Sequence, residues 1–480
     1  MGEAAREHSG RLARLWEAAH APVSPGSLVA FRVLFGLLAF VGAVRFLANG
    51  WVERFFERPR FFFHYWGFEW VEVLSPAAMQ AAFVALAVLG LMIAAGLFYR
   101  VAIVAYFLLF TYVELIDVTN YLNHYYLVSL LAFWMALMPL GRVRGLDGRL
   151  FGGARRTLPR WMVWALRLQV GVVYFYAGLA KLTGDWLLHA QPLGIWLGSR
   201  GEAPLIGALV QHEWAPLVMS WAGFLYDTTI PFWLSWRRTR GPAYGLLLVF
   251  HLCTHLLFTI GMFPLIMSAA ATVFFAPDWP RRFAKRFMKR FHERASKGDA
   301  EGAAAAGAGS GRAPAMSPAR LALAGGLVLV AAVQVLAPLR AHAYGGDVLW
   351  HEQGMRWSWR VMCREKDGSV LYRVRVPGRR RELRVPPSRY LTPHQEREMS
   401  GQPDLILQLA HHIRDEYVVR HGEGVEVRVD ALASLNGRPM ARLIDPEVDL
   451  ATVEDGLAPA EWILPGPDEA PVRWAHGESR

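Results

Sequence analysis

Long uncharged apolar runs alternate with polar segments along most of the chain. Nine such runs lie at about residues 28–47, 78–98, 101–117, 124–140, 163–182, 215–236, 243–259, 263–277 and 320–338. An α-helix needs roughly 20 apolar residues to cross the hydrocarbon core of a bilayer. The pattern therefore predicts an α-helical multi-pass membrane domain with about nine spanning helices, which makes the lipid bilayer its first partner.

Arginine residues are concentrated in every second loop between these runs. Segments 141–162, 237–242 and 278–319 are rich in arginine. Segment 183–204 has a single arginine, and the arginines of segment 48–77 are balanced by four glutamates. Because cytoplasmic loops carry the excess of Lys and Arg, this distribution predicts a protein of the cell membrane with a cytoplasmic N-terminus and an extracytoplasmic C-terminal domain.

The polar segments set the expected domain limits. Residues 281–294 (RRFAKRFMKRFHER) combine basic residues with a phenylalanine at every fourth position, which is typical of a helix lying on an anionic membrane surface. Residues 298–316 are rich in Gly and Ala, which indicates a flexible linker. The predicted parts are an N-terminal amphipathic segment (1–26), a transmembrane domain of eight spans that holds the candidate catalytic residues (27–280), a basic surface helix and flexible linker (281–319), a ninth span (320–340) and a small extracytoplasmic α+β domain (341–480).

The sequence after residue 340 has the pattern of a globular domain. Residues 356–363 and 369–376 flank Asp367-Gly368, which indicates a β-hairpin with its turn at this dipeptide. Apolar residues at helical spacing predict a helix over 403–420, and strict alternation predicts a strand over 425–435.

Composition narrows the possible partners. Apolar residues make up 54% of the chain, and the net charge is +11. The cations lie between apolar runs, where membrane topology places them, so we expect no nucleic-acid partner. Cys253 falls in an apolar run and Cys363 in the polar C-terminal region, so we expect no disulfide, and no zinc-binding spacing occurs.

One lysine lies inside an apolar run, where an ionisable residue is costly and indicates a functional site. Lys181 is in the last turn of the fifth run, in VYFYAGLAKLTGDW. Its ammonium could extend to the membrane interface, or it could pair with Asp185 four residues further on. Alternatively, Ala177 and Gly178 lie one turn back on the same face and leave room for a ligand beside the amine. Desolvation there would favour a neutral amine that acts as a base.

Two further polar clusters occur in the apolar runs. The segment DVTNYLNHYY places Asn123 and His124 at the outer start of the fourth run, either as a polar helix start or as part of a site. The segment FHLCTHLLFTIGMF has His251 and His255 four residues apart. Without a neighbouring carboxylate this pair favours the hydrogen-bonding wall of a pocket, so we predict no metal. Together the clusters predict a site that opens outward or laterally to a lipophilic ligand.

These segments resemble blocks of the vitamin K-dependent γ-glutamyl carboxylase family, including its bacterial members with the horizontally transferred transmembrane (HTTM) domain. The resemblance covers roughly residues 25–465. Its blocks are GWVERFFERPRFFFHYWGFEWV (50–71), NHYYLVSLLAFWMALM (123–138), YFYAGLAKLTGDW (174–186), FHLCTHLLFTIGMF (250–263), WHEQGMRWSWRVM (350–362) and SLNGRPMARLIDPEVDL (434–450).

The resemblance implies a reaction and roles for individual residues. In that family a lysine amine deprotonates the hydroquinone, and oxygen adds to the anion. The rearranged alkoxide then takes the γ-proton of a glutamyl side chain, and the carbanion captures carbon dioxide. By resemblance the catalytic residues are Lys181 and His124, the quinone-binding residues are Asn123, His251, Tyr174, Gly178 and His255, and the residues that approach the glutamyl substrate are Trp357 and Trp359.

The predicted function is therefore a vitamin K-dependent γ-glutamyl carboxylase that couples hydroquinone epoxidation to carboxylation of protein glutamate. The resemblance implies reduced vitamin K of the menaquinol or phylloquinol type, with oxygen and carbon dioxide as co-substrates and a glutamate-containing protein or peptide as partner. Two alternatives are a membrane quinol epoxidase or oxidoreductase without carboxylation, and a non-enzymatic membrane protein that binds or transports a lipophile.

Overall fold

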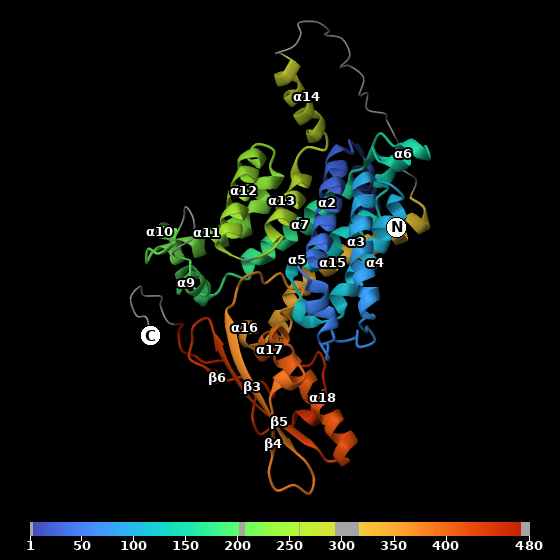
Figure 1. The fold of residues 1–480 in the computed structure, drawn as a ribbon. Coiled ribbons are helices and arrows are strands. Elements are labelled where there is room, and N and C mark those ends of the chain that lie inside the picture. The colour runs from blue at the N-terminus through green and yellow to red at the C-terminus, as the bar shows by residue number, and fades with distance from the viewer. Residues whose placement is uncertain (1–2, 201–206, 259, 293–315, 472–480) are drawn as a thin grey trace.

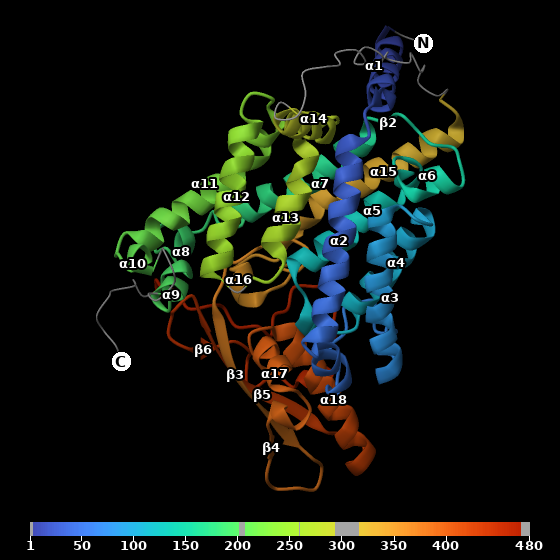
Figure 2. The same cartoon turned by 45° about the horizontal axis from the view of Figure 1, so that its top comes forward.

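A computed structural model of the chain describes residues 3–200, 207–258, 260–292 and 316–471. The described part consists of a helical bundle and a C-terminal domain with a sheet, which lie at opposite ends of the molecule in Figures 1 and 2. The predicted linker at 298–316 falls almost entirely outside the described residues.

Helices make up nearly all of the bundle. They are α1 (Glu3–His20), α2 (Gly26–Ala48), the π-helical turn η1 (Glu53–Glu57), α3 (Pro76–Ala95), α4 (Tyr99–Leu115), α5 (Asn123–Ala136), α6 (Leu146–Leu150), α7 (Trp161–Leu179), α8 (Gly184–Leu187), α9 (Leu193–Gly198), α10 (Gly207–Val210), α11 (Ala215–Ser235), α12 (Arg240–Leu257), α13 (Phe263–Ala271), α14 (Trp279–His292) and α15 (Pro318–Leu336). A short antiparallel pair, β1 (Pro22–Val23) and β2 (Leu158–Pro159), joins two of their connections.

The predicted apolar runs all fold as helices, but the expected nine spans are not confirmed. In the described part of the chain, four helices are long and apolar enough to cross a membrane: Gly26–Ala48, Pro76–Ala95, Trp161–Leu179 and Pro318–Ala343. Helices α4, α5 and α13 have only 17, 14 and 9 residues. Helices α11 and α12 carry buried polar residues, Asp227 and His251, which lower their apolar character.

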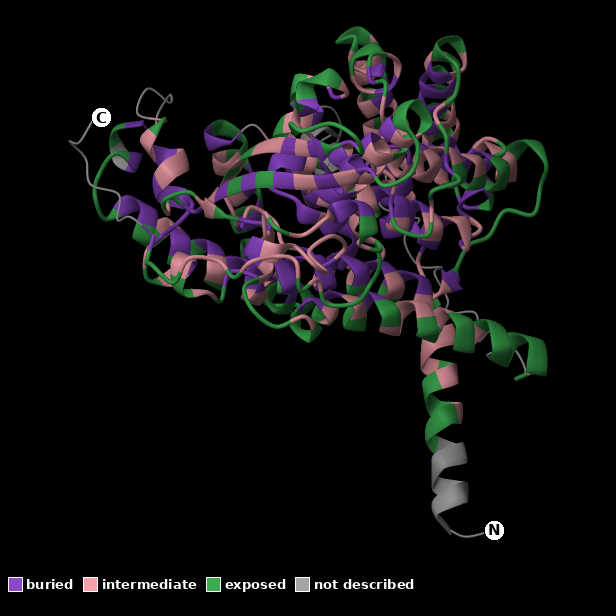
Figure 3. Ribbon diagram, turned by 90° about the horizontal axis from the view of Figure 1, so that it is seen from below, coloured by how far each residue is buried: buried purple, intermediate pink, exposed green. Residues whose placement is uncertain are grey.

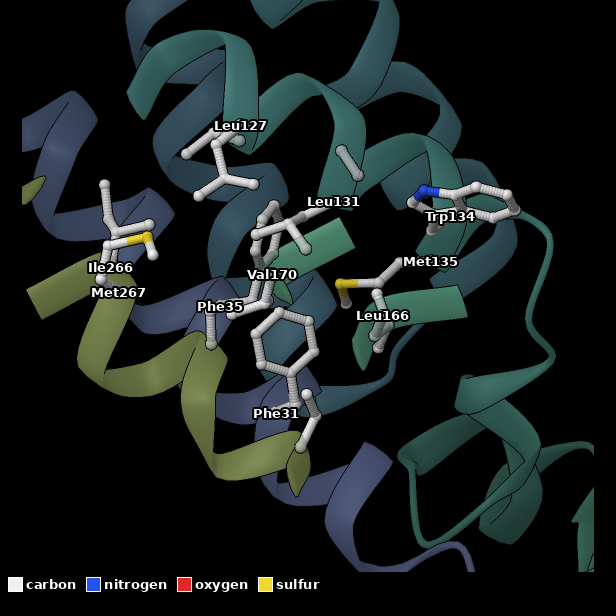
Figure 4. Packing of buried hydrophobic residues seen from close by; sticks show 14 of the residues in the cluster. Phe31, Phe35, Leu127, Leu131, Trp134, Met135, Leu166, Val170, Ile266 and Met267 are labelled. Carbon is white, nitrogen blue, oxygen red and sulfur yellow. The ribbon is translucent and has the colours of Figure 1, made fainter. Parts of the chain in front are cut away.

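The core of the bundle lies where four helices from distant parts of the sequence meet. Figure 4 shows Phe31 and Phe35 of α2, Leu127, Leu131, Trp134 and Met135 of α5, Leu166 and Val170 of α7, and Ile266 and Met267 of α13 packed against one another. Because these side chains pack closely in one cluster, they hold α2, α5, α7 and α13 together.

The C-terminal domain is a four-stranded antiparallel sheet packed against helices. Its strands are β3 (Lys366–Arg375), β4 (Leu383–Val385), β5 (Glu426–Leu435) and β6 (Ala441–Arg442), in the order β4-β3-β5-β6, and its helices are α16 (Val348–His351), α17 (Pro393–Ser400) and α18 (Pro403–His421). The helix predicted over 403–420 and the strand predicted over 425–435 are confirmed as α18 and β5. Leu405, Leu409, Ile413 and Tyr417 form the buried face of α18.

The predicted hairpin turn at Asp367-Gly368 is wrong. Both residues lie inside β3, where Asp367 pairs with Ser434 and Gly368 with Ala433 of β5. A Cβ atom at Gly368 would lie 2.2 Å from the carbonyl oxygen of Ser400. The close approach of α17 to the strand therefore requires a glycine here. In the sequence, the resulting Asp-Gly pair looks like a turn.

The C-terminal domain is joined to the bundle by hydrogen bonds of two glutamines. The backbone N–H of His64 donates to Oε1 of Gln408, and the Nε2 group of Gln408 donates to the carbonyl oxygen of His64, both at 3.0 Å. Gln395 of α17 donates to the carbonyl oxygen of Phe61 at 2.7 Å and to the carboxylate of Asp117 at 2.9 Å. These bonds hold α17 and α18 against the segment that follows η1 and against Asp117, at the start of η2 (Val118–Asn120).

The polar N-terminal segment and the basic segment after α13 both form helices, α1 and α14, as their patterns predict. Figure 2 shows both at the end of the bundle opposite the C-terminal domain, and Figure 3 shows α1 projecting from the rest of the molecule. Their contact with a membrane surface stays a prediction.

Candidate functional site

A cavity of about 590 Å³ lies mainly within the bundle and is completed by a few residues of the C-terminal domain. Its size is within the range of sites that bind small organic ligands. Most of the lining is apolar, including Phe31, Phe35, Leu38, Tyr106, Leu131 and Ile266 from the bundle core. The polar residues of the lining are Arg45, Arg54, Glu114, Thr119, Asn120, Asn123, His124, His394 and Glu398. The cavity is therefore suited to an amphipathic ligand.

Asn123 and His124 are the first two residues of α5, and both line this cavity. This is the position at which the sequence placed a polar cluster, the start of the fourth apolar run. The Oδ1 atom of Asn123 accepts a hydrogen bond from the hydroxyl of Tyr121 at 3.0 Å, which fixes the amide. The ring of His124 lies between those of Tyr125 and Phe263, at centroid distances of 4.6 and 5.9 Å. Among the described residues, no group hydrogen-bonds the imidazole of His124, so both ring nitrogens can bond to a ligand.

Lys181 lies on a second, smaller cavity of about 90 Å³ and is only 5% exposed. Its ammonium donates to Asp227 of α11 at 2.9 Å, to the carbonyl oxygen of Ala177 at 2.9 Å and to that of Val361 at 3.3 Å. The last of these comes from the C-terminal domain. Lys181 is thus held from three sides, and its side chain does not extend to a membrane interface.

The acidic partner of Lys181 is Asp227, which the sequence reasoning missed, and not Asp185. The carboxylate of Asp185 is bound instead by Arg438 and Asn436 of the C-terminal domain, at 2.6 to 2.8 Å. The Lys181–Asp185 pairing is therefore excluded. Asp227 is the single acidic residue of the apolar run 215–236, and this isolation was the signal that could have identified it.

Tyr174 and His251 also line the smaller cavity, and their side chains are joined by a hydrogen bond of 2.8 Å between the hydroxyl and Nε2. The Nδ1 atom of His251 is buried without a partner among the described residues. His255, four residues on, is exposed and lines neither cavity. Of the two histidines, His251 therefore lies at the candidate site and His255 does not. The expected absence of a metal stays a prediction.

Gly178 was expected to leave room for a ligand beside Lys181, but it lines neither cavity. A Cβ atom there would lie 2.4 Å from Oγ1 and 2.5 Å from the backbone nitrogen of Thr228. The space beside this glycine is filled by α11. The small size of Gly178 is thus explained by the close packing of α7 and α11, which brings Lys181 to Asp227.

Trp357 and Trp359 line neither cavity. Trp359 is 1% exposed and stacks on Tyr126 at 5.0 Å, while Trp357 stacks on Tyr65 at 5.6 Å. Both tryptophans have a positive φ, near 60°. The residues that follow, Val361 and Met362, line both cavities. Contact of the two tryptophans with a glutamyl substrate stays a prediction.

The two cavities adjoin each other, since Ile260, Phe263, Val361 and Met362 line both. The residues expected around one quinone are therefore distributed over two spaces. Asn123 and His124 line the large cavity, whereas Tyr174, His251 and Lys181 line the small one. Sequence reasoning also missed the charged residues of the large cavity, including Glu114, whose carboxylate accepts a hydrogen bond from Ser129.

Comparison with known families agrees with this architecture. The HTTM domain matches residues 20–279, and the lumenal domain of vitamin K-dependent gamma-carboxylase matches residues 320–469. No solved structure matches the chain. The first match covers more than half of the 480 residues and contains the bundle, while the second contains the last apolar helix and the domain with the sheet. The chain is thus a membrane protein with a lumenal domain, and it belongs to the HTTM-containing members of the vitamin K-dependent γ-carboxylase family.

Proposed function

We propose that the protein couples epoxidation of reduced vitamin K by oxygen to γ-carboxylation of a glutamyl side chain. The family supports carboxylase chemistry in general terms. The observation that carries the finer assignment is the buried Lys181 on a small cavity that shares four lining residues with a large amphipathic one. The residue that we propose as the base thus lies next to a space large enough for a lipophilic quinol.

The large cavity is the proposed quinol site. Its apolar lining suits the ring system and the start of an isoprenoid or phytyl tail. Asn123 and His124 supply hydrogen-bonding groups for the quinol oxygens, and the His124 imidazole has no competing partner among the described residues. The quinol hydroxyl reaches Lys181 past Phe263 and Met362, which line both cavities.

Lys181 acts as a base only when its amine is uncharged. Asp227, 2.9 Å away, is the group that can accept the ammonium proton. Both side chains are less than 10% exposed, and transfer of the proton from the ammonium to the carboxylate would remove both buried charges at once, which offsets the loss of their attraction. We therefore assign Asp227 the role of holding the proton that Lys181 releases before it deprotonates the quinol.

The overall reaction balances with the co-substrates of the family. One atom of O₂ enters the epoxide and the other leaves as water, and the hydroquinone supplies the electrons. The glutamyl γ-carbon loses a proton and forms a carbon–carbon bond to CO₂. A buried site suits this chemistry because it keeps water away from a strongly basic intermediate.

The proposed topology places the N-terminus in the cytoplasm and the C-terminal domain on the other side of the cell membrane. The support is that α1 and the basic α14 lie at the end of the bundle opposite the C-terminal domain (Figure 2). A glutamate-containing protein or peptide would then approach from the extracytoplasmic side, and the quinol from the bilayer.

The test is a product analysis on detergent-solubilised full-length protein. Reduced vitamin K, oxygen, labelled bicarbonate and a Glu-rich peptide are supplied to the wild type, to Lys181→Ala and to Lys285→Ala. Lys285 is an exposed lysine of α14 and serves as the matched control. We expect epoxide and acid-stable label on the peptide from the wild type and the control, and neither product from Lys181→Ala.

Two other outcomes would change the assignment. Epoxide without labelled peptide, across several Glu-containing sequences, would favour a quinol epoxidase without carboxylation. Neither product from a folded wild type, with menaquinol and phylloquinol both supplied, would overturn the enzymatic assignment in favour of a lipophile-binding or transport protein.

A further inference from the structure

The mouth of the large cavity holds two arginines that the proposed reaction has not yet used. Arg45 lies in the last turn of α2, and Arg54 in η1 just beyond it. Both line the cavity, on the side where His394 and Glu398 of α17 complete it. Phe55 and His394 are in ring contact at 5.1 Å, so η1 and α17 lie together where the cavity lining reaches the surface at the exposed Arg54.

The two guanidinium groups have no carboxylate partner among the described residues. Arg45 is half-buried, and its guanidinium carbon lies 5.3 Å from the Trp51 ring centroid. Arg54 is exposed and lies at the same distance from Phe55. By contrast, the nearby Arg58 is bound by Glu53 at 2.9 Å and does not line the cavity. A half-buried arginine without a counter-ion favours an anionic ligand at this position.

We propose that Arg45, assisted by Arg54, binds the side-chain carboxylate of the glutamyl substrate at the mouth of the large cavity. This inference rests on the proposed function. It assigns the substrate carboxylate to a place that Trp357 and Trp359 do not reach.

The chemistry of the reaction favours a cation at that carboxylate. Removal of the γ-proton leaves the electron pair on the carbon next to a carboxylate, so a second negative charge develops beside the first. A guanidinium held at the carboxylate stabilises this charge more in the transition state than in the bound substrate. Addition of CO₂ then produces a dicarboxylate, for which two guanidinium groups at one opening offer two carboxylate sites.

Its location also supports the assignment. The polar lining residues His394 and Glu398 come from the C-terminal domain, whereas Phe31 and Phe35 belong to the bundle core. Arg54 is exposed and Arg45 is half-buried, so a peptide that enters from the solvent would meet Arg54 first and Arg45 next. The glutamyl carboxylate would then lie at the end of the cavity that also contains His124.

The test compares Arg45→Gln, Arg45→Lys and the control Arg58→Gln in the full-length protein. We expect Arg45→Gln to raise KM for a Glu-rich peptide by about 10- to 100-fold, since a lost charge-assisted hydrogen bond has roughly this effect. We also expect fewer labelled carboxylates per epoxide formed. Arg45→Lys should restore part of the loss, because it keeps the charge without the planar fork, and Arg58→Gln should resemble the wild type.

A binding measurement makes the proposal testable without turnover. The wild type should bind the Glu-rich peptide more tightly than the same peptide with Gln at each Glu, and Arg45→Gln should remove this difference. Unchanged peptide affinity and unchanged label per epoxide in Arg45→Gln would overturn the proposal. So would a loss confined to binding of phosphatidylglycerol in nanodiscs, which would assign Arg45 to a lipid headgroup. A wild type that forms no product but shows the Arg45-dependent preference would contradict only the proposed function.

Discussion

At the scale of the residue, the central feature is a lysine and an aspartate buried against each other. The side chains of Lys181 and Asp227 are 7% and 9% exposed, and their charged groups lie 2.9 Å apart. Neither charge could be buried alone without a cost of several kcal/mol. The pair is thus stable only as a unit, and a proton can move within it without leaving the site.

Removal of one partner is expected to cost far more stability than removal of both. Asp227→Asn leaves the lysine buried without its counter-ion, so the free energy of unfolding should fall by about 3 kcal/mol. The double variant Lys181→Met with Asp227→Leu should recover most of this loss. Thermal unfolding in detergent measures both effects.

The control for this prediction is Glu53→Gln, which breaks an exposed pair with Arg58. Their side chains are 52% and 65% exposed, so the change should stay within about 0.5 kcal/mol. Equal stability of Asp227→Asn and Glu53→Gln would mean that the buried pair contributes nothing to the fold.

At the scale of the element, the geometry of the site depends on how closely α7 approaches α11. Gly178 of α7 is in contact with the backbone of Thr228, one residue after Asp227. Lys181 follows Gly178 by three residues, so the same contact sets the distance between the lysine and its partner. Gly171, two turns earlier on α7, faces Pro231 of α11 with ordinary space between them, because a Cβ atom there would lie 3.8 Å away.

These two glycines give a matched pair of substitutions on one helix. Gly178→Ala should force α7 and α11 apart, lower stability by about 2 kcal/mol and abolish product formation. Gly171→Ala should be neutral or stabilising by up to about 1 kcal/mol, because alanine favours the helix. Thermal unfolding and epoxide formation are measured for each. Full activity in Gly178→Ala would show that close helix packing is not needed for the site.

At the scale of the whole molecule, the C-terminal domain completes a site that the bundle alone does not possess. Val361 accepts a hydrogen bond from Lys181, and Met362 lines both cavities. Docking of this domain is therefore expected to affect catalysis directly. One of its attachments is ionic: the guanidinium of Arg438 binds both carboxylate oxygens of Asp185, at 2.6 and 2.7 Å.

This attachment predicts a defined dependence of stability on pH. Burial by itself would raise the pKa of Asp185, but hydrogen bonds from Arg438 and Asn436 outweigh burial and hold the pKa below its ordinary value of 3.8. A carboxyl group whose pKa is depressed in the folded state stabilises the fold above its unfolded pKa, and this contribution is lost as the pH falls through the folded pKa.

Asp185→Asn should therefore lower stability by about 2 kcal/mol between pH 5 and 7, and the difference from the wild type should shrink below about pH 4. Thermal unfolding of both proteins from pH 3 to 7 measures this. Asp415→Asn, at an aspartate that is 65% exposed, should show little difference at any pH. A deficit in Asp185→Asn that does not shrink at all as the pH falls from 5 to 3 would contradict an ionic origin.

How far the sequence predicts each feature depends on the range of the interactions involved. The apolar runs, α18 and β5 follow from the period of apolar residues, because that period is a property of neighbouring positions. The helical nature of all nine runs was correct, but their number as spans was not confirmed. Length and polar content differ among the helices, and α4, α5 and α13 are too short to be counted as membrane spans by length and composition.

The sequence by itself determined that the protein is a membrane protein with a C-terminal α+β domain, and that Lys181, His124 and His251 are polar residues in apolar surroundings. These features need only the local cost of placing a polar group in an apolar run. Only the tertiary structure decided that Lys181 pairs with Asp227, that the candidate residues line two cavities, and that Arg45 lies at the mouth of the larger one. Lys181 and Asp227 are 46 residues apart. Their contact depends on the packing of α7 against α11, which no local pattern in the sequence encodes.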